Sequence, residues 1–131
     1  LLFPVFVLSQ SYILPNEAVV HSFQTESGKI MELARDTANK YLVYRFGTKN
    51  KVELAFPKKY LESWKQFSYS YYLRDGGAEN EGLDLNYLYF TIDNIQYVIY
   101  DTYVSSEGKN KIGIKVIDLK TKKDGGYKRK S

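Results

Sequence analysis

Apolar and polar residues alternate with a period of two along most of this chain, and this alternation is what most constrains its fold. Val52, Leu54 and Phe56 illustrate the pattern, since they fall on one face of their segment. Lys51 and Glu53 fall on the opposite face. Side chains at positions i and i+2 of a β-strand point to the same side of a sheet, so the pattern predicts strands with one buried face. The chain shows no apolar stripe with the 3.6-residue period of an amphipathic helix.

Turn signals interrupt the alternation about every ten residues and divide it into about eight strands. Asp93 and Asn94 predict a two-residue hairpin turn, because both tolerate the positive φ that such turns need. Segment 60–64 is compatible with one helical turn or with the lead-in to a strand. We therefore predict an all-β fold, an antiparallel meander of about eight strands that forms a small barrel or sandwich. The expected strands are 19–25, 30–35, 41–46, 51–56, 65–73, 85–92, 95–105 and 112–118.

The 131 residues of the chain provide for one domain with one core. Residues 1–8 are apolar, and Ser9-Gln10-Ser11 follows them with a small-x-small pattern of the kind that signal peptidases accept. We interpret residues 1–11 as the remnant of a signal peptide, with an amphiphilic first strand as the alternative. The apolar run is too short to span a bilayer, so no transmembrane segment is expected. Residues 12–119 are predicted to form a single β domain, and the expected location is periplasmic or secreted.

Residues 120–131 are expected to form a basic, flexible tail. They hold six of the 19 Lys and Arg residues and one of the 15 acids, which leaves 13 cations and 14 acids in the rest of the chain. A domain that binds nucleic acid carries its positive charge on the folded surface, where the charge meets phosphates. Since the excess is confined to the tail, nucleic acid is not an expected partner.

The residue types that most catalytic sites need are scarce. The chain has no cysteine, which excludes a disulfide framework, a zinc–thiolate site and a cysteine nucleophile. Its one histidine, His21, lies in a predicted strand, and no G-x-S-x-G motif presents a serine nucleophile. The carboxylates of segment 74–84 fit no calcium-loop pattern. We predict a protein that is not an enzyme and has no metal site and no cofactor; the alternative is a small carboxylate-dependent hydrolase that uses Asp84.

Nine of the 13 tyrosines fall between Tyr60 and Tyr103. Two strand-like runs, 67–73 and 85–90, carry most of them, and a polar, glycine-rich loop, 74–84, separates the runs. Tyrosine combines a large apolar ring with a polar hydroxyl, so the ring can make an apolar contact while the hydroxyl stays in water. This segment is therefore expected to contact a partner or ligand. We predict that the binding residues are Tyr72, Arg74, Asp75, Asp84, Asn86 and Tyr87.

Arg74 begins the loop and has two candidate roles. It can pair with Asp84 and fix the loop, or it can project outward as an anchor for an acidic partner. The alternation places Tyr69 and Tyr71 on one face of their strand and Tyr72 on the other. It does not show which face is the core, so a structural cross-strand role and a binding role both stay open for the tyrosines.

A series of short motifs lies between Phe23 and Leu119. These are Ser27-Gly28-Lys29, Tyr41-Leu42-Val43-Tyr44-Arg45-Phe46-Gly47, Lys51-Val52-Glu53-Leu54, Ser63-Trp64, Phe67-Ser68-Tyr69 and Gly82-Leu83-Asp84-Leu85-Asn86-Tyr87. On these motifs, of which the last is the most specific, the chain resembles a group of small exported bacterial all-β proteins of unknown function. Members of the group tend to have a glycine where this chain has Asp75. The resemblance implies an all-β fold and export, and it implies no chemistry.

Together these features predict an exported, non-catalytic binding protein. The expected partner is another protein of the cell envelope, and the expected action is that of an inhibitor or immunity protein on a partner enzyme. The reason is that a rigid β scaffold with a loop containing Tyr and Arg has the composition of interface hot spots. A carbohydrate- or peptidoglycan-binding module is the alternative, because aromatic faces also suit sugars.

Overall fold

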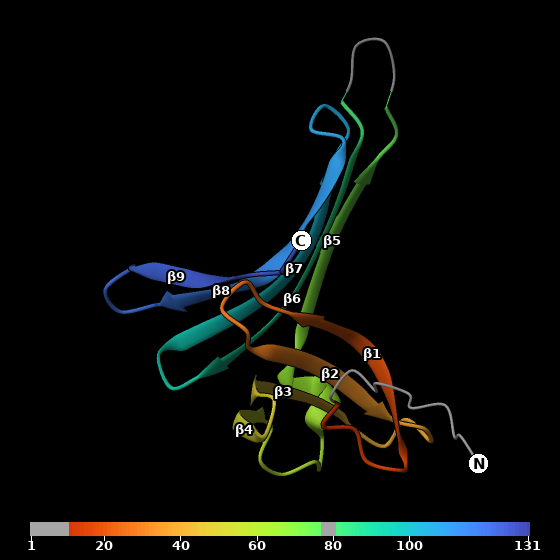
Figure 1. Cartoon of the computed structure of the whole chain (residues 1–131), viewed down its shortest axis with the longest axis vertical. Coiled ribbons are helices and arrows are strands. Elements are labelled where there is room, and N and C mark those ends of the chain that lie inside the picture. Colours follow the sequence, from red (N-terminus) through yellow and green to blue (C-terminus); the bar gives the residue numbers. More distant parts are fainter. Residues whose placement is uncertain (1–10, 77–80) are drawn as a thin grey trace, which may run out of the picture.

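The computed structural model describes residues 11–76 and 81–131, and within them it contains nine β-strands and one short 3-10 helix (Figure 1). Burial does not alternate in every strand as the sequence pattern predicts, because residues 42–47 are buried on both faces and residues 68–73 are exposed on both. The elements are β1 (Glu17–Gln24), β2 (Ile30–Asp36), β3 (Leu42–Thr48), β4 (Lys51–Phe56), η1 (Ser63–Gln66), β5 (Ser68–Arg74), β6 (Leu83–Ile92), β7 (Ile95–Val104), β8 (Lys109–Asp118) and β9 (Asp124–Lys128).

The strands form two sheets that pack face to face. Sheet 1 has the order β1-β2-β3-β4 and sheet 2 has the order β5-β6-β7-β8-β9, and all neighbours are antiparallel. The predicted antiparallel all-β meander is confirmed. Of the two forms considered, the fold is a sandwich, because the sheets are not closed into a barrel. An isolated bridge between Thr25 and Arg129 links the chain after β1 to the chain after β9.

The observed strands follow the predicted ones in order and position. The hairpin turn at Asp93 and Asn94 is confirmed, and Asp93 has a φ of 53°. The helical alternative for the segment after β4 is correct, since η1 begins at Ser63. The prediction of a flexible tail over 120–131 is wrong at its centre, because Asp124–Lys128 forms β9. This strand adds to the edge of β8 through its backbone, with two glycines at positions where other strands carry side chains, so no alternation revealed it.

Aromatic rings fill the space between the two sheets. Phe90 of β6 lies among rings from both sheets: its centroid is 4.3 Å from that of Phe56, 5.1 Å from that of Tyr97 and 4.9 Å from that of Tyr44. These separations are typical of favourable aromatic pairs, and rings of this size dominate the energetics of a core. The buried core consists of Phe23, Met31, Leu33, Leu42, Tyr44, Phe46, Phe90, Ile99, Ile112 and Ile114.

The outer face of sheet 1 holds a buried ion pair. Arg45 of β3 donates hydrogen bonds to both carboxylate oxygens of Glu17 of β1, at 2.6 and 2.9 Å. The hydroxyl of Tyr41 donates to the same carboxylate at 2.6 Å, and the backbone N–H of Leu14 donates at 2.9 Å. Burial by itself would raise the pKa of Glu17, but these hydrogen bonds, with Arg45 foremost, lower it from 4.5 to about 2. The pair is therefore fully charged at neutral pH.

The segment that precedes β1 belongs to this outer layer. The Ser11 hydroxyl donates to Glu32 of β2 at 2.7 Å, and the Tyr12 hydroxyl donates to the backbone carbonyl of Thr48. Ser11, which the sequence assigned to the signal-peptide remnant, thus contacts the sandwich. Residues 1–10, the remainder of that assignment, lie outside the described residues.

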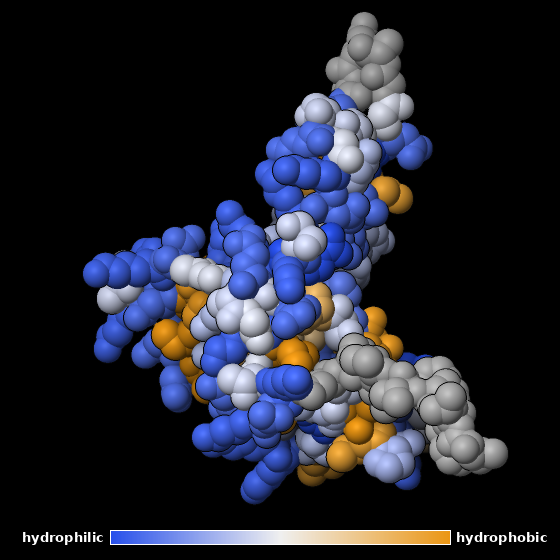
Figure 2. Space-filling view, in the orientation of Figure 1, coloured by the Kyte–Doolittle hydropathy of each residue, from blue (hydrophilic) through white to orange (hydrophobic). Residues whose placement is uncertain are grey.

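Sheet 2 extends beyond sheet 1 at one end. Strands β6, β7 and β8 have ten residues each, whereas the strands of sheet 1 have six to eight. The far ends of the β5–β6 and β7–β8 hairpins therefore project past the two-layered half (Figure 1). Figure 2 shows most hydrophobic atoms of this view over the two-layered half, whereas the projecting half is mainly blue and white. The face of sheet 2 that covers the core in one half is open to solvent in the other.

Candidate functional site

The six residues predicted to bind a partner are divided between the two faces of sheet 2. Asp84 and Asn86 lie on the inner face, which also carries Phe90 of the same strand. Asp75 follows β5 in the hairpin loop and is exposed. The outer face carries Tyr72, Arg74 and Tyr87. The six residues therefore do not form one site, since Asp84 and Asn86 lie together on the inner face and Tyr72, Arg74 and Tyr87 share the outer face.

Arg74 fixes the hairpin loop, which is one of the two roles considered for it. Its Nε donates to the backbone carbonyl of Glu81 at 2.7 Å, on the other side of the loop. Asp84, the partner expected from the sequence, accepts instead from Asn86 Nδ2 at 2.9 Å. In the strand register Asp84 lies opposite Leu73, one residue away from Arg74 and on the other face of the sheet.

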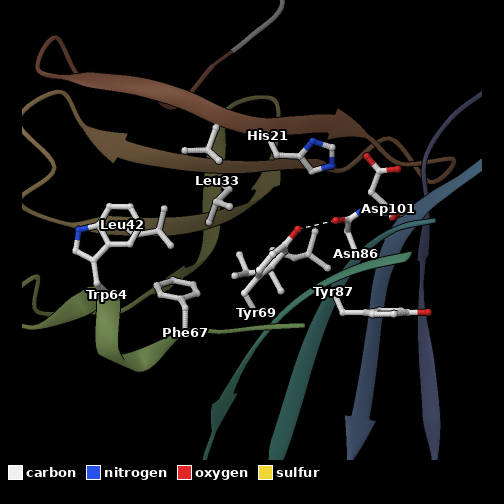
Figure 3. A pocket seen from close by; sticks show the side chains of 12 residues that line it. His21, Leu33, Leu42, Trp64, Phe67, Tyr69, Asn86, Tyr87 and Asp101 are labelled. Carbon is white, nitrogen blue, oxygen red and sulfur yellow. Dashed lines mark hydrogen bonds between the residues drawn. The ribbon is translucent and has the colours of Figure 1, made fainter. Parts of the chain in front are cut away.

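A pocket of about 410 Å³ lies where the inner face of sheet 2 diverges from sheet 1 (Figure 3). Its walls are mainly apolar, and a few polar groups gather at one end, which is the usual composition of a small-molecule site. The Tyr87 ring is directed away from the other labelled side chains, in keeping with its place on the outer face (Figure 3). The lining residues are Val20, His21, Leu33, Leu42, Trp64, Phe67, Tyr69, Asn86, Tyr87, Leu88, Ile99 and Asp101.

The apolar end of the pocket is built by Trp64, Phe67 and Leu42 (Figure 3). Helix η1 positions Trp64, because the hydroxyl of Ser63 accepts a hydrogen bond from the backbone N–H of Leu42 at 2.9 Å. The indole N–H donates to the backbone carbonyl of Asn39 at 2.9 Å. The Trp64 side chain is thus held in place and still 44% exposed, which leaves part of its ring available for a ligand.

The polar end is formed by His21, Asn86 and Asp101 (Figure 3). The hydroxyl of Tyr69 donates to Asn86 Oδ1 at 2.5 Å. The carboxylate of Asp101 accepts from Asn110 Nδ2 at 3.0 Å. These bonds orient the amide and the carboxylate, and both are only partly buried.

Nε2 of His21 is buried and has no hydrogen-bond partner within the described residues. Burial lowers the pKa of His21, the nearby Asp101 carboxylate opposes this effect, and Arg129 adds to it. The imidazole is therefore uncharged at neutral pH, and its buried Nε2 is left unpaired. A buried polar atom without a partner is costly, so this nitrogen is suited to receive one from a ligand.

Strand β5 forms an edge of sheet 2, and its residues before Arg74 have none of the usual protections of an edge. One side of its backbone pairs with β6, and no strand of the described residues pairs with the other side. All positions from Ser68 to Leu73 are exposed and uncharged. Edge strands are normally blunted by charged residues, Pro or bulges. The exposed fractions of the large side chains are 60% for Tyr69, 69% for Tyr71, 50% for Tyr72 and 67% for Leu73.

Sequence reasoning did not find the pocket. His21 and Trp64 were visible as the only residues of their types. They lie on β1 and in η1, however, and only the packing of the two sheets brings them to the same cavity. The exposed tyrosines were expected to make contacts, but the alternation could not show that their strand is an edge.

Residues 11–76 and 81–131 contain no group of three or more His, Cys, Asp or Glu side chains placed to hold a metal ion. In the described part of the chain no helix has the length and apolar character needed to cross a membrane. Comparisons with protein families, curated proteins and solved structures found no match. A function is therefore proposed from the fold and its surfaces alone.

Proposed function

We propose that this protein is an exported, non-catalytic binding protein, periplasmic or secreted, that holds an extended segment of a protein partner along β5. The observation that carries the proposal is the open, uncharged edge of this strand. A partner strand added to the edge would pair with the free backbone N–H and C=O groups. The exposed tyrosines beside the edge would supply the apolar contacts, and tyrosine is enriched at the centres of protein interfaces.

The other edge strands differ from β5 in ways that support its special role. Strand β4 carries Lys51 and Glu53, and Pro57 follows it directly. Strand β1 has an irregular register between Val19 and His21. Strand β9 has only five residues, two of them glycines. Charge, irregularity and shortness all hinder the addition of a further strand, whereas β5 keeps a regular register with β6 and is uncharged from Ser68 to Leu73, with Arg74 as its last residue.

The position of β5 also fits a protein partner. Its hairpin with β6 projects past the two-layered half, so a large partner can reach the edge without contacting sheet 1 (Figure 1). Tyr69, Tyr71 and Leu73 lie on one face of the strand, so we expect the partner segment to be apolar at alternate positions. An enzyme held in this way would be obstructed by the hairpin, which is the action of an inhibitor or immunity protein.

Binding of a glycan is a second candidate, and one observation favours it. The rings of Tyr69 and Tyr71 have centroids 5.9 Å apart and an interplanar angle of 24° on an open face. Two nearly parallel, exposed rings can stack against successive sugar units. Peptidoglycan fragments that bind the wild-type protein and not a Tyr71→Ala variant would support this candidate.

The test of the main proposal is capture of a partner from cell-envelope extract by the immobilised protein. We compare the wild type with Tyr71→Lys, which places a charge on the β5 edge, and with Val19→Lys, which places the same charge on the β1 edge. Both positions are exposed, at 69% and 46%. We expect one stoichiometric protein to be captured by the wild type and by Val19→Lys and to be lost with Tyr71→Lys. A partner that Tyr71→Lys retains would contradict binding at β5.

A further inference from the structure

We propose that the pocket between the sheets binds a neutral amphiphile that carries a hydroxyl group. Its ring or chain would lie between Trp64, Phe67 and Leu42, and its hydroxyl would reach His21. This site shares Tyr69 with β5, but the proposal does not depend on the partner proposed for the edge of that strand.

The apolar part of the ligand follows from the walls of the pocket. Trp64 and Phe67 present aromatic rings at the apolar end, and Leu33, Leu42 and Ile99 complete the wall. The volume of about 410 Å³ is in the range of small-molecule sites. A flat ring or a short aliphatic chain would bury apolar surface here against side chains that the core and η1 already hold in place.

The unpaired nitrogen of His21 is the reason for a hydroxyl group on the ligand. Its Nε2 is buried without a partner in the described residues, and the imidazole is uncharged at neutral pH. A hydroxyl can donate to this nitrogen or accept from it, so it suits either tautomer of the ring. Asn86 offers a second polar contact at the same end of the pocket.

The neutrality of the ligand follows from the charges around the polar end. Asp101 lines this end, and Asp84 is hydrogen-bonded to Asn86 beside it. Asp101 and Arg129 are the charged groups that act on His21, and of the two only Asp101 lines the pocket. A ligand carboxylate would face like charges there, and burying such a charge without a partner is costly.

The proposal is tested with two probes that share one ring system, 2-naphthol and 2-naphthoate. The chain has a single tryptophan, so one indole N–H resonance in a nitrogen–proton correlation spectrum reports on Trp64. We expect 2-naphthol to shift this resonance and to bind with a Kd of roughly 100 μM by titration calorimetry, as befits a ligand of this size. We expect 2-naphthoate to bind at least about tenfold more weakly. Equal affinity for both probes, or no shift of the indole resonance, would overturn the proposal.

Three variants examine the roles of the polar groups. His21→Leu should weaken 2-naphthol binding about three- to tenfold, the usual effect of one lost hydrogen bond. Asp101→Asn should narrow the preference for naphthol over naphthoate by about fivefold or more, because it removes the repelling charge. Tyr72→Ala, on the outer face, should change neither affinity. Far-UV circular dichroism verifies that each variant is folded. If folded His21→Leu binds 2-naphthol as tightly as the wild type, the proposed hydrogen bond to His21 is wrong. If folded Asp101→Asn keeps the full preference for naphthol over naphthoate, the proposed repulsion by Asp101 is wrong.

Discussion

Sheet 1 carries a polar cluster on each face, and the two clusters differ in how completely their groups are paired. On the outer face Glu17 accepts four hydrogen bonds, two from Arg45 and one each from Tyr41 and a backbone N–H. On the inner face the imidazole of His21 has a buried nitrogen without a partner in the described residues. The outer face also has one such atom, Glu32 Oε1, but it lies outside the set of hydrogen bonds around Glu17. Both clusters lie beside apolar packing, so burial alone does not explain the difference.

The difference indicates what each cluster is for. Buried charges are tolerated when every donor and acceptor is satisfied, and such clusters stabilise one arrangement of the chain. A group left unpaired lowers stability and is retained where a ligand can complete it. We therefore expect substitutions of polar residues to be destabilising in the cluster around Glu17 and neutral or stabilising at the polar end of the pocket.

The largest effect is expected from Arg45→Met. This change removes one partner of the ion pair and leaves the Glu17 carboxylate buried with an uncompensated charge. Breaking a buried pair in this way costs about 3–5 kcal/mol. Urea unfolding followed by the fluorescence of Trp64 measures the loss. Arg35→Met is the matched control, because Arg35 donates to the exposed Asn39, and its effect should stay within about 0.5 kcal/mol.

The pH dependence of stability sharpens the assignment of this cost to the Glu17 carboxylate. Its pKa falls from 4.5 to about 2 on folding, so its contribution is fully present above 4.5 and is lost as the pH falls towards 2. Glu17→Gln removes the contribution, which such a shift places at about 3 kcal/mol. The difference in unfolding free energy between wild type and variant should therefore be largest at pH 7 and shrink steadily below 4.5. A difference that is the same at pH 7 and pH 3 would show that shape rather than charge is responsible.

A pair of identical substitutions compares the two clusters directly. Tyr41→Phe removes a hydroxyl that donates to the buried Glu17 carboxylate at 2.6 Å. Tyr69→Phe removes a hydroxyl that donates to Asn86 at 2.5 Å in an exposed setting. Hydrogen bonds to charged, buried groups are worth about 1.5–3 kcal/mol, whereas the exposed bond can be replaced by water and should cost less than about 0.5 kcal/mol. Equal losses in urea unfolding would mean that the polar end of the pocket is as tightly organised as the outer cluster.

Most of the fold could be predicted from the sequence because its strands depend on local alternation. Val52, Leu54 and Phe56 show the period of two, and the Asp93-Asn94 turn has its own chemistry. Strand β9 could not be predicted in this way. It is held by backbone hydrogen bonds to β8. Those bonds depend on β8 having an unoccupied side in the assembled sheet, and no local sequence pattern records this.

The candidate site could be predicted only in part. Asp84 and Asn86 were chosen from the sequence, and they do lie together on the inner face. Tyr72 and Arg74 lie on the other face. The sequence could not show this, because the period of two separates residues into faces without showing which face meets the second sheet. The Glu17–Arg45 pair and the pocket each join side chains far apart in the sequence, so they depend on packing that no local pattern records.

The effect of His21→Leu should be smaller than those of Arg45→Met, Glu17→Gln and Tyr41→Phe, and its sign should be opposite to theirs. Leucine removes the unpaired nitrogen and keeps an apolar side chain against the ring of Phe23, which lies 5.7 Å from the imidazole centroid. We expect a gain of about 1 kcal/mol at pH 7, the order of the penalty for an unsatisfied buried group. Ser22→Ala is the control on the same strand, since Ser22 is exposed and its change should be close to neutral.

The pH dependence of this gain separates the histidine from simple repacking. Burial lowers the pKa of His21 below its ordinary 6.5, so the folded state binds fewer protons than the unfolded state as the pH falls through 6.5. Wild-type stability therefore declines on acidification through this group, and His21→Leu is free of that decline. The gain of the variant should be larger at pH 5 than at pH 8 in urea unfolding. A loss of stability at both pH values would show that His21 is satisfied in the native protein, and the contrast between the two faces of sheet 1 would then fail.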